Sequence, residues 1–108
     1  MQHSAYLSKI SNTLTCIADA IEAADISGSF DAELQGGVLT IYLPNQQQYV
    51  INQHAPTQQL WLSSPYSGAS HFCWDAAKGR WHDNKHQREL MSLLYQEFLT
   101  YYQLILAL

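Results

Sequence analysis

The sequence predicts an α+β fold, a two-layer sandwich with two helices packed on one face of a five- to six-stranded antiparallel sheet. Apolar residues recur with helical periodicity at both ends of the chain, and short stretches rich in β-branched and aromatic residues lie between them. A chain of 108 residues can bury one core without disulfide bonds. We therefore expect a single domain over residues 1–108, with the second face of the sheet open to solvent.

The first helix is predicted from one apolar stripe. Six side chains recur at steps of three and four residues: Leu7, Ile10, Leu14, Ile17, Ile21 and Ala24. This spacing predicts a helix of about 20 residues that ends at Asp25 and the Ser-Gly-Ser cluster at 27–29. Asp19 then points away from the stripe and Glu22 flanks it.

Short strands are expected in the middle of the chain. Their predicted ranges are 30–35, 38–43, 49–52, 58–63, 71–74 and a short segment around Trp81. The Gly-Gly pair at 36–37 suits the tight turns of hairpins, and Pro44-Asn45 predicts the next turn. Residues 64–68 are expected to form a loop.

Alternation along these strands assigns the two faces of the sheet. The face expected to meet the helices carries Leu39, Ile41, Leu43, Tyr49, Ile51, Leu60 and Leu62. The opposite face, called the open face below, carries Val38, Thr40, Tyr42, Val50, Asn52, Gln59, Trp61 and Ser63. Trp61 is notable there, because an aromatic side chain on a polar surface often marks a contact site. The alternative is that a loop covers Trp61.

The last helix is predicted to begin near Asn84, because Asn84 and Gln87 have the spacing of a capping box. Its core stripe is expected to comprise Leu90, Leu94, Phe98, Tyr101 and Ile105. The apolar tail at 104–108 needs cover, and a place between the two helices would provide it.

Charge and cysteine content narrow the classes of function. The formal net charge of −4 disfavours nucleic acid as a partner. No apolar stretch reaches the roughly 20 residues that span a bilayer, so we expect no membrane contact. Cys16 and Cys73 occur in no metal-binding or redox spacing. We expect two reduced, mostly buried thiols, which would fit a cytoplasmic protein.

Motifs for catalysis or tight metal binding are absent from the sequence. It contains no glycine-rich phosphate loop, nucleophile elbow, paired-cysteine motif or HExxH motif. His82 and His86 have the i, i+4 spacing of a helical metal pair, but they lie where a strand gives way to a helix. We interpret these two, together with His3, His54 and His71, as polar surface residues.

Acidic residues gather in the first half of the chain. Residues 1–50 contain one base and five acids, namely Asp19, Glu22, Asp25, Asp31 and Glu33. The end of the first helix and the first strand could bring them to one edge, where carboxylate oxygens suit hard cations such as ferric iron, calcium or manganese. An open edge supplies few ligands, which predicts weak binding. The same edge could instead dock a basic patch of a protein.

Four segments in the middle of the chain form a more specific pattern. They are Asp31-x-Glu33-Leu34-x-Gly36-Gly37-Val38-Leu39-Thr40-Ile41, Tyr49-Val50-Ile51-Asn52, Pro56-x-x-Gln59-Leu60-Trp61-Leu62-Ser63-Ser64-Pro65-x-Ser67-Gly68 and Phe72-x-Trp74. This pattern resembles the frataxin family in its bacterial, CyaY-type form. The resemblance extends in element order over residues 3–103, is weak in the two helices, and implies the same helix–sheet–helix sandwich.

The resemblance also implies a function. Frataxins are not conventional enzymes; they bind Fe²⁺ or Fe³⁺ weakly through an acidic ridge and act in iron–sulfur cluster assembly, where they contact the cysteine desulfurase and its scaffold protein. Carried over to this chain, the metal-binding ridge would be Asp19, Glu22, Asp25, Asp31 and Glu33. The partner-binding residues would be Asn52, Gln59 and Trp61. We expect other divalent cations to substitute for iron, and the metal-free protein to be a monomer.

The chain departs from that family in ways that affect the expected metal binding. Ala18, Ala23, Ser27 and Ser29 stand where bacterial relatives often have acids, which should reduce the number and affinity of bound ions. Two other functions stay open. One is iron oxidation or storage, which needs converging ligands, and the other is a metal-independent protein-interaction domain that uses the open face around Trp61.

Overall fold

The computed structural model describes residues 1–108 and contains two helices and seven strands. Helix α1 is His3–Ala24 and helix α2 is Leu90–Tyr102. The strands are β1 (Asp31–Gln35), β2 (Val38–Tyr42), β3 (Gln48–His54), β4 (Gln59–Ser64), β5 (Gly68–Asp75), β6 (Arg80–Asp83) and β7 (Arg88–Glu89). A 3-10 turn, η1 (Ala55–Thr57), joins β3 to β4.

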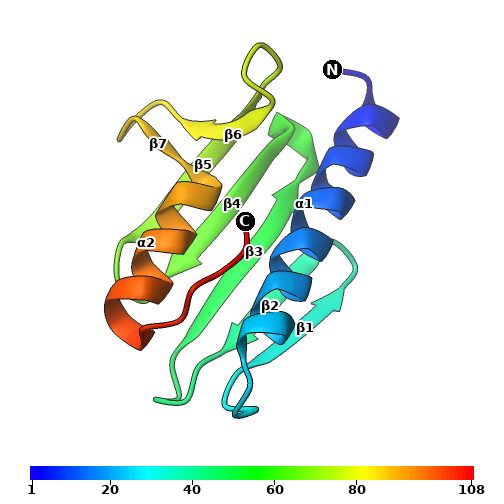
Figure 1. Cartoon of the computed structure of the whole chain (residues 1–108). Coiled ribbons are helices and arrows are strands. Elements are labelled where there is room, and N and C mark those ends of the chain that lie inside the picture. The colour runs from blue at the N-terminus through cyan, green and yellow to red at the C-terminus, as the bar shows by residue number, and fades with distance from the viewer.

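The seven strands form one antiparallel sheet in sequence order, and both helices lie on the same face of it (Figure 1). β1 and β7 are the edge strands. The predicted α+β two-layer sandwich is therefore confirmed, although the sheet has seven strands where five to six were expected. The additional strand, β7, has only two residues, too few to produce an alternating pattern in the sequence.

The core lies between the helices and the sheet, on the sheet face that alternation predicts. Each of the seven sheet residues assigned to that face is at most 5% exposed. The stripe on α1 packs against them through Ile10, Leu14, Ile17 and Ile21. Full burial of an aliphatic side chain contributes about 1.5–3 kcal/mol, so this interface is the main source of stability.

Tyr6 ties α1 to the place where β3 passes into β4. Its hydroxyl accepts a hydrogen bond from the N–H of His54 at 2.9 Å and donates one to the carbonyl oxygen of Gln59 at 2.6 Å. The turn η1 separates these two backbone groups along the chain. One side chain of the helix layer thus positions the backbone of two open-face residues.

The prediction that the last helix begins near Asn84 is wrong. Residues 84–87 form the turn between β6 and β7, in which the Gln87 side chain donates to the carbonyl oxygen of Asn84 at 2.8 Å. Helix α2 begins at Leu90 and is capped by Glu89, whose carboxylate accepts hydrogen bonds from the N–H groups of Met91 and Ser92 at 2.6 and 3.1 Å. Polar residues three apart suit a tight turn as well as a helix start, and here the turn prevails.

The end of α2 also differs from the expected stripe. The helix ends at Tyr102, and Gln103 follows with a left-handed backbone at φ 53°. Tyr101 and Ile105 are therefore 50% and 66% exposed, and not part of the core as predicted. The tail itself runs back between the two helices, where Leu106 is buried, as the sequence predicts (Figure 1).

Both cysteines are free, and both are exposed, so the expected burial of the two thiols is wrong. Cys16 lies on an outer position of α1, and Cys73 lies on the open face of β5, where its sulfur accepts a hydrogen bond from the Gln59 amide at 3.5 Å. Neither helix is both long enough and apolar enough to span a membrane.

Candidate functional site

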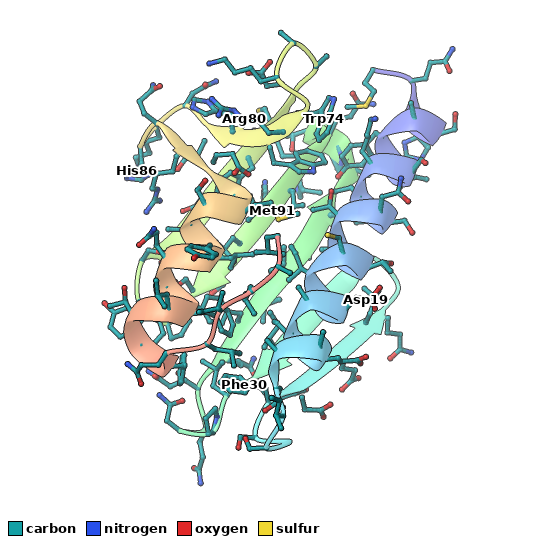
Figure 2. The ribbon with its side chains drawn as sticks, in the orientation of Figure 1. Asp19, Phe30, Trp74, Arg80, His86 and Met91 are labelled. Atoms are coloured by element: carbon teal, nitrogen blue, oxygen red, sulfur yellow. The ribbon has the colours of Figure 1, made fainter.

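The acidic residues lie along the β1 edge of the molecule, on two levels. Asp19, labelled in Figure 2, is exposed on one of the last two turns of α1, in the helix layer. Glu22 is exposed on the same part of the helix. Asp31 and Glu33 are exposed on β1, opposite Tyr42 and Thr40, so they point to the open-face side of the same edge. The strand therefore separates the two acidic pairs.

No group of three or more His, Cys, Asp or Glu side chains converges in a way that could hold a metal ion. None of the five ridge acids forms an ion pair, because both ion pairs in the structure involve Asp83. The edge therefore combines unneutralised negative charge with the absence of a closed coordination sphere. Its separate carboxylate oxygens fit a hard cation that keeps much of its water, and they equally fit basic side chains of a protein.

Asp25 differs from the other four acids because its carboxylate is used within the chain. It accepts hydrogen bonds from the N–H of Phe30 at 2.8 Å, the N–H of Ser29 at 3.0 Å and the hydroxyl of Ser27 at 3.3 Å. The bond from Phe30 does most to hold the pKa of Asp25 below its usual range, and those from Ser29 and Ser27 add to it. Asp25 thus shapes the loop from α1 to β1, which leaves fewer lone pairs for a metal.

The open face brings together the three residues expected to bind a partner. Asn52 lies directly opposite Trp61 across β3 and β4. Gln59 lies two residues before Trp61 on the same strand. Its side-chain oxygen accepts a hydrogen bond from the indole N–H of Trp61 at 2.9 Å. The side chain of Asn52 donates to the carbonyl oxygen of Gln53 at 3.0 Å. The three residues form one contiguous patch in the middle of the sheet.

Two histidines cover the indole ring of Trp61 in this patch. His54 stacks on one face, with ring centroids 3.7 Å apart and an interplanar angle of 9°. His71 stacks nearly parallel to the same ring, with centroids 4.2 Å apart and an angle of 11°. Trp61 is therefore half-buried by two imidazole rings and not by a loop, which was the alternative considered from the sequence.

Sequence reasoning missed this stack because it treated each histidine as an isolated surface residue. The signal lay in the strand register: His71 is the direct partner of Trp61 across β4 and β5, and His54 lies two residues beyond the other partner, Asn52. The loop predicted at 64–68 obscured this register: Ser64 and Gly68 are the paired ends of β4 and β5, so only residues 65–67 connect the two strands and the prediction is wrong at both of its ends.

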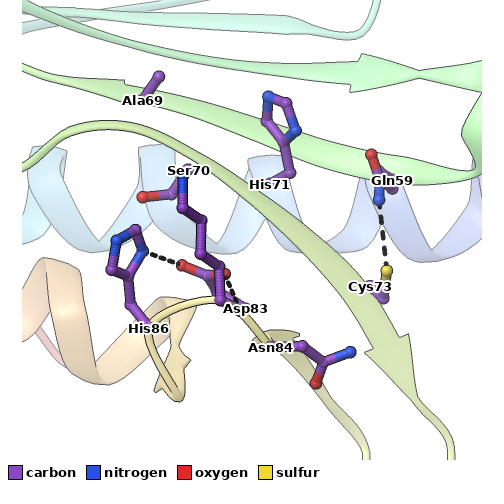
Figure 3. Close-up of a pocket in the computed structure, with 9 residues that line it drawn as sticks. Gln59, Ala69, Ser70, His71, Cys73, Asp83, Asn84 and His86 are labelled. Atoms are coloured by element: carbon purple, nitrogen blue, oxygen red, sulfur yellow. Dashed lines mark hydrogen bonds and ion pairs between the residues drawn. The ribbon is translucent and has the colours of Figure 1, made fainter.

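Beside the stack lies a surface hollow of about 380 Å³ between β5 and the β6–β7 turn (Figure 3). Gln59, His71 and Cys73 line its sheet side, and Lys85 and His86 line its other side. The lining is mostly polar, so the hollow is suited to polar or charged groups and not to an apolar ligand.

Asp83 at the edge of this hollow is only 3% exposed. Its carboxylate accepts a hydrogen bond from the backbone N–H of Lys85 at 2.9 Å, and it contacts the imidazole ring of His86 at 3.0 Å and the guanidinium of Arg88 at 3.4 Å. Burial alone would raise the pKa of Asp83, but these hydrogen bonds outweigh it and hold the pKa below its usual range. The one acid of the hollow is thus neutralised from within the chain.

The fold and the two surfaces define the chain as a small α+β domain with an acidic edge and an open sheet face built around one tryptophan. Residues 1–103 match the model of the frataxin-like domain. The chain belongs to the frataxin family, and the resemblance seen in the sequence is confirmed.

Relatives of known identity include mitochondrial and bacterial members. The mitochondrial frataxin of Dictyostelium discoideum is 39% identical over 82 residues, which cover 76% of this chain and 42% of that protein. The iron-sulfur cluster assembly protein CyaY of Pseudomonas aeruginosa is 37% identical over 78 residues, or 72% of this chain and 69% of that protein. The chain spans less than half the length, 42–46%, of the three mitochondrial relatives.

Solved structures agree with this assignment. The frataxin of Psychromonas ingrahamii has a TM-score of 0.85 over 98% of this chain and 96% of its own, and at 21% identity it supports the fold alone. Trimeric frataxin of the yeast Saccharomyces cerevisiae, complexed with ferrous iron, has a TM-score of 0.74 at 30% identity, covering 85% of this chain and 83% of that one.

Proposed function

We propose that this protein is an iron-binding regulator or adaptor of iron–sulfur cluster assembly and not an enzyme. The observation that carries the proposal is the unneutralised acidic edge on a chain of the frataxin family. The name of the Pseudomonas relative and the ferrous complex of the yeast relative support the pathway and the metal. The proposal includes a cytoplasmic location and a monomer in the absence of metal.

The proposed mechanism is electrostatic. Asp19, Glu22, Asp31 and Glu33 attract Fe²⁺ or Fe³⁺, with Asp25 as a weaker contributor because its oxygens already hold the loop. The same carboxylates attract a basic groove of the cysteine desulfurase, which raises the association rate more than the final affinity. The patch of Asn52, Gln59 and Trp61 supplies a second contact with the desulfurase or its scaffold protein.

The test replaces the four exposed acids by their amides and leaves Asp25 in place, since its loss would disturb the loop. We expect Asp19→Asn, Glu22→Gln, Asp31→Asn and Glu33→Gln together to weaken desulfurase binding at least about tenfold, equivalent to about 1.4 kcal/mol. Isothermal titration calorimetry with a desulfurase and with Fe²⁺ measures both interactions. Lys78→Gln, a single charge change on the β5–β6 turn, is the control. Unchanged iron and desulfurase titrations in the fourfold variant would contradict the proposal.

A metal-independent protein-interaction domain is the second candidate, and the ordered stack on the open face favours it. In that case a partner binds equally well after chelation of iron, and Trp61→Ala abolishes binding while the fourfold acidic variant retains it. Oxygen consumption after addition of Fe²⁺, with and without the four acids, separates both candidates from an iron-oxidising or iron-storing protein.

A further inference from the structure

The open face presents histidines to an approaching molecule, and not the faces of the indole ring. His54 and His71 cover the ring of Trp61, and its N–H is bonded to Gln59. The usual ways in which a tryptophan contacts a partner, through its ring face or its N–H, are therefore already taken. The outer faces of the two imidazoles and the edge of the indole are what remains.

The surroundings of the stack are rich in basic groups. Four of the five Lys and Arg residues lie between 78 and 88, on β6, β7 and their turns. Lys85 and His86 line the hollow beside His71. Arg88 donates to the hydroxyl of Ser70 at 2.7 Å under the same hollow.

The acidic groups of this region are already engaged. Asp83 is buried and bound by Lys85, His86 and Arg88. Glu89, opposite His82 across β6 and β7, caps α2, and Asp75 accepts hydrogen bonds from the backbone of the next turn. No free carboxylate therefore neutralises the hollow, and the titratable groups on its sheet side are His71 and Cys73.

We propose that the stack of His54, Trp61 and His71, together with the adjoining hollow, is a proton-dependent docking site for an acidic segment of a protein partner. Carboxylates of that segment bind His71, His86 and Lys85, and the stack supplies a flat wall beside them. The inference rests on the proposed function only in requiring that a protein partner reaches the open face.

Protons control this site because histidine is the side chain whose charge changes between about pH 5 and pH 8. A protonated imidazole on the face of an indole gains a cation–π attraction, so the stack survives protonation and becomes tighter. Binding of carboxylates to a protonated imidazole must, by linkage, weaken as the proton is lost, by up to about tenfold per pH unit for each proton required. At alkaline pH only Lys85 and Arg88 keep their charge.

The experiment titrates the ¹⁵N-labelled protein with a hexaglutamate peptide at about pH 6 and about pH 8, followed by two-dimensional NMR. We expect at least about tenfold tighter binding at the lower pH, with shifts of the Trp61 indole N–H and of the amides around His71 and His86. His71→Phe keeps a stacked ring but cannot take up a proton, so the indole signal should stay in place while the pH dependence falls. His3→Asn, on the first turn of α1, is the matched control and should behave like the unchanged protein.

Equal affinity at both pH values would overturn the proposal, as would peptide shifts that lie outside the open face or an unchanged pH dependence in His71→Phe. Self-association at about pH 6 in sedimentation, lost in the fourfold acidic variant, would assign the site to a second copy of this chain and would also overturn it. Desulfurase binding is measured in parallel at about pH 8, at the upper end of the range in which histidine side chains generally change charge. Its loss in the fourfold acidic variant tests the proposed function separately from the docking site.

Discussion

Asp83 shows how a single buried acid can stabilise this fold in a pH-dependent way. Its pKa lies below the ordinary 3.8, because hydrogen bonds from His86, Lys85 and Arg88 outweigh the effect of burial. A carboxyl with a depressed pKa in the folded state contributes stability above its unfolded pKa, and this contribution is lost as the pH falls through the folded value. The protein should therefore lose stability on acidification partly through this residue.

We predict that Asp83→Asn lowers the free energy of unfolding by about 1–3 kcal/mol at pH 7, since it leaves buried donors poorly paired. The difference from the unchanged protein should be smaller at about pH 3, because the contribution of the carboxylate is lost as the pH falls through the depressed pKa of the folded state. Urea unfolding at both pH values measures it. Asp19→Asn, at an exposed acid without an ion pair, is the control, and an equal loss at both pH values would show that the carboxylate charge is not responsible.

At the scale of elements, the contact of α1 with the β3–β4 connection determines where the open-face patch sits. The Tyr6 hydroxyl on α1 makes hydrogen bonds to the backbone of both His54 and Gln59. Burial raises the pKa of this hydroxyl, with the hydrogen bond from His54 acting in the opposite direction, so it remains a donor at neutral pH. The helix layer thus supports the stack on the other side of the sheet.

Tyr6→Phe should lower the free energy of unfolding by about 1–3 kcal/mol, because an N–H and a carbonyl group lose their partner in a buried place. The same variant should shift the NMR signals of His54 and of the Trp61 indole N–H, which a purely local loss would not do. Tyr95→Phe on α2 is the matched control, since its hydroxyl makes no hydrogen bond within the chain. Unfolding measured in urea decides the first point, and unaltered Trp61 signals would contradict the second.

The elements also show which parts of the structure can be predicted from sequence. The α1 stripe and the alternation in β2, β3 and β4 are long enough to repeat, so periodicity predicts both the elements and their buried faces. The start of α2 is not predictable in this way. Glu is an uncommon N-cap residue, whereas Asn is a common one, so the sequence favours Asn84 over the actual cap, Glu89. The stack on Trp61 depends on the register of three strands, which is a property of pairing and not of any one segment.

At the scale of the whole molecule, charge is divided between the two edges of the sheet. The ridge acids lie at the β1 edge, and four of the five Lys and Arg residues lie at or near the β7 edge. The two groups do not pair with each other, since the ion pairs are confined to Asp83. This separation is expected of surfaces that meet other molecules, because charges that served stability would be placed beside their opposites.

The acidic edge should therefore reduce stability, a cost that its proposed role in binding would explain. Asp19 and Glu22 lie in the last turns of α1, where the helix dipole disfavours negative charge by about 0.3–1 kcal/mol per residue at low salt. Mutual repulsion with Asp31 and Glu33 adds to this effect. Salt weakens both effects, because at 0.1 M exposed charges more than about 10 Å apart are largely screened from each other. We predict that the fourfold amide variant, with Asp25 retained, is more stable than the unchanged protein by about 0.5–2 kcal/mol at low salt. Urea unfolding at low and at high sodium chloride concentration measures the gain, which should fade as salt increases. A loss of stability would instead mean that these carboxylates hold the fold together. Their exposure would then no longer be evidence that the edge is kept for iron or for a basic partner.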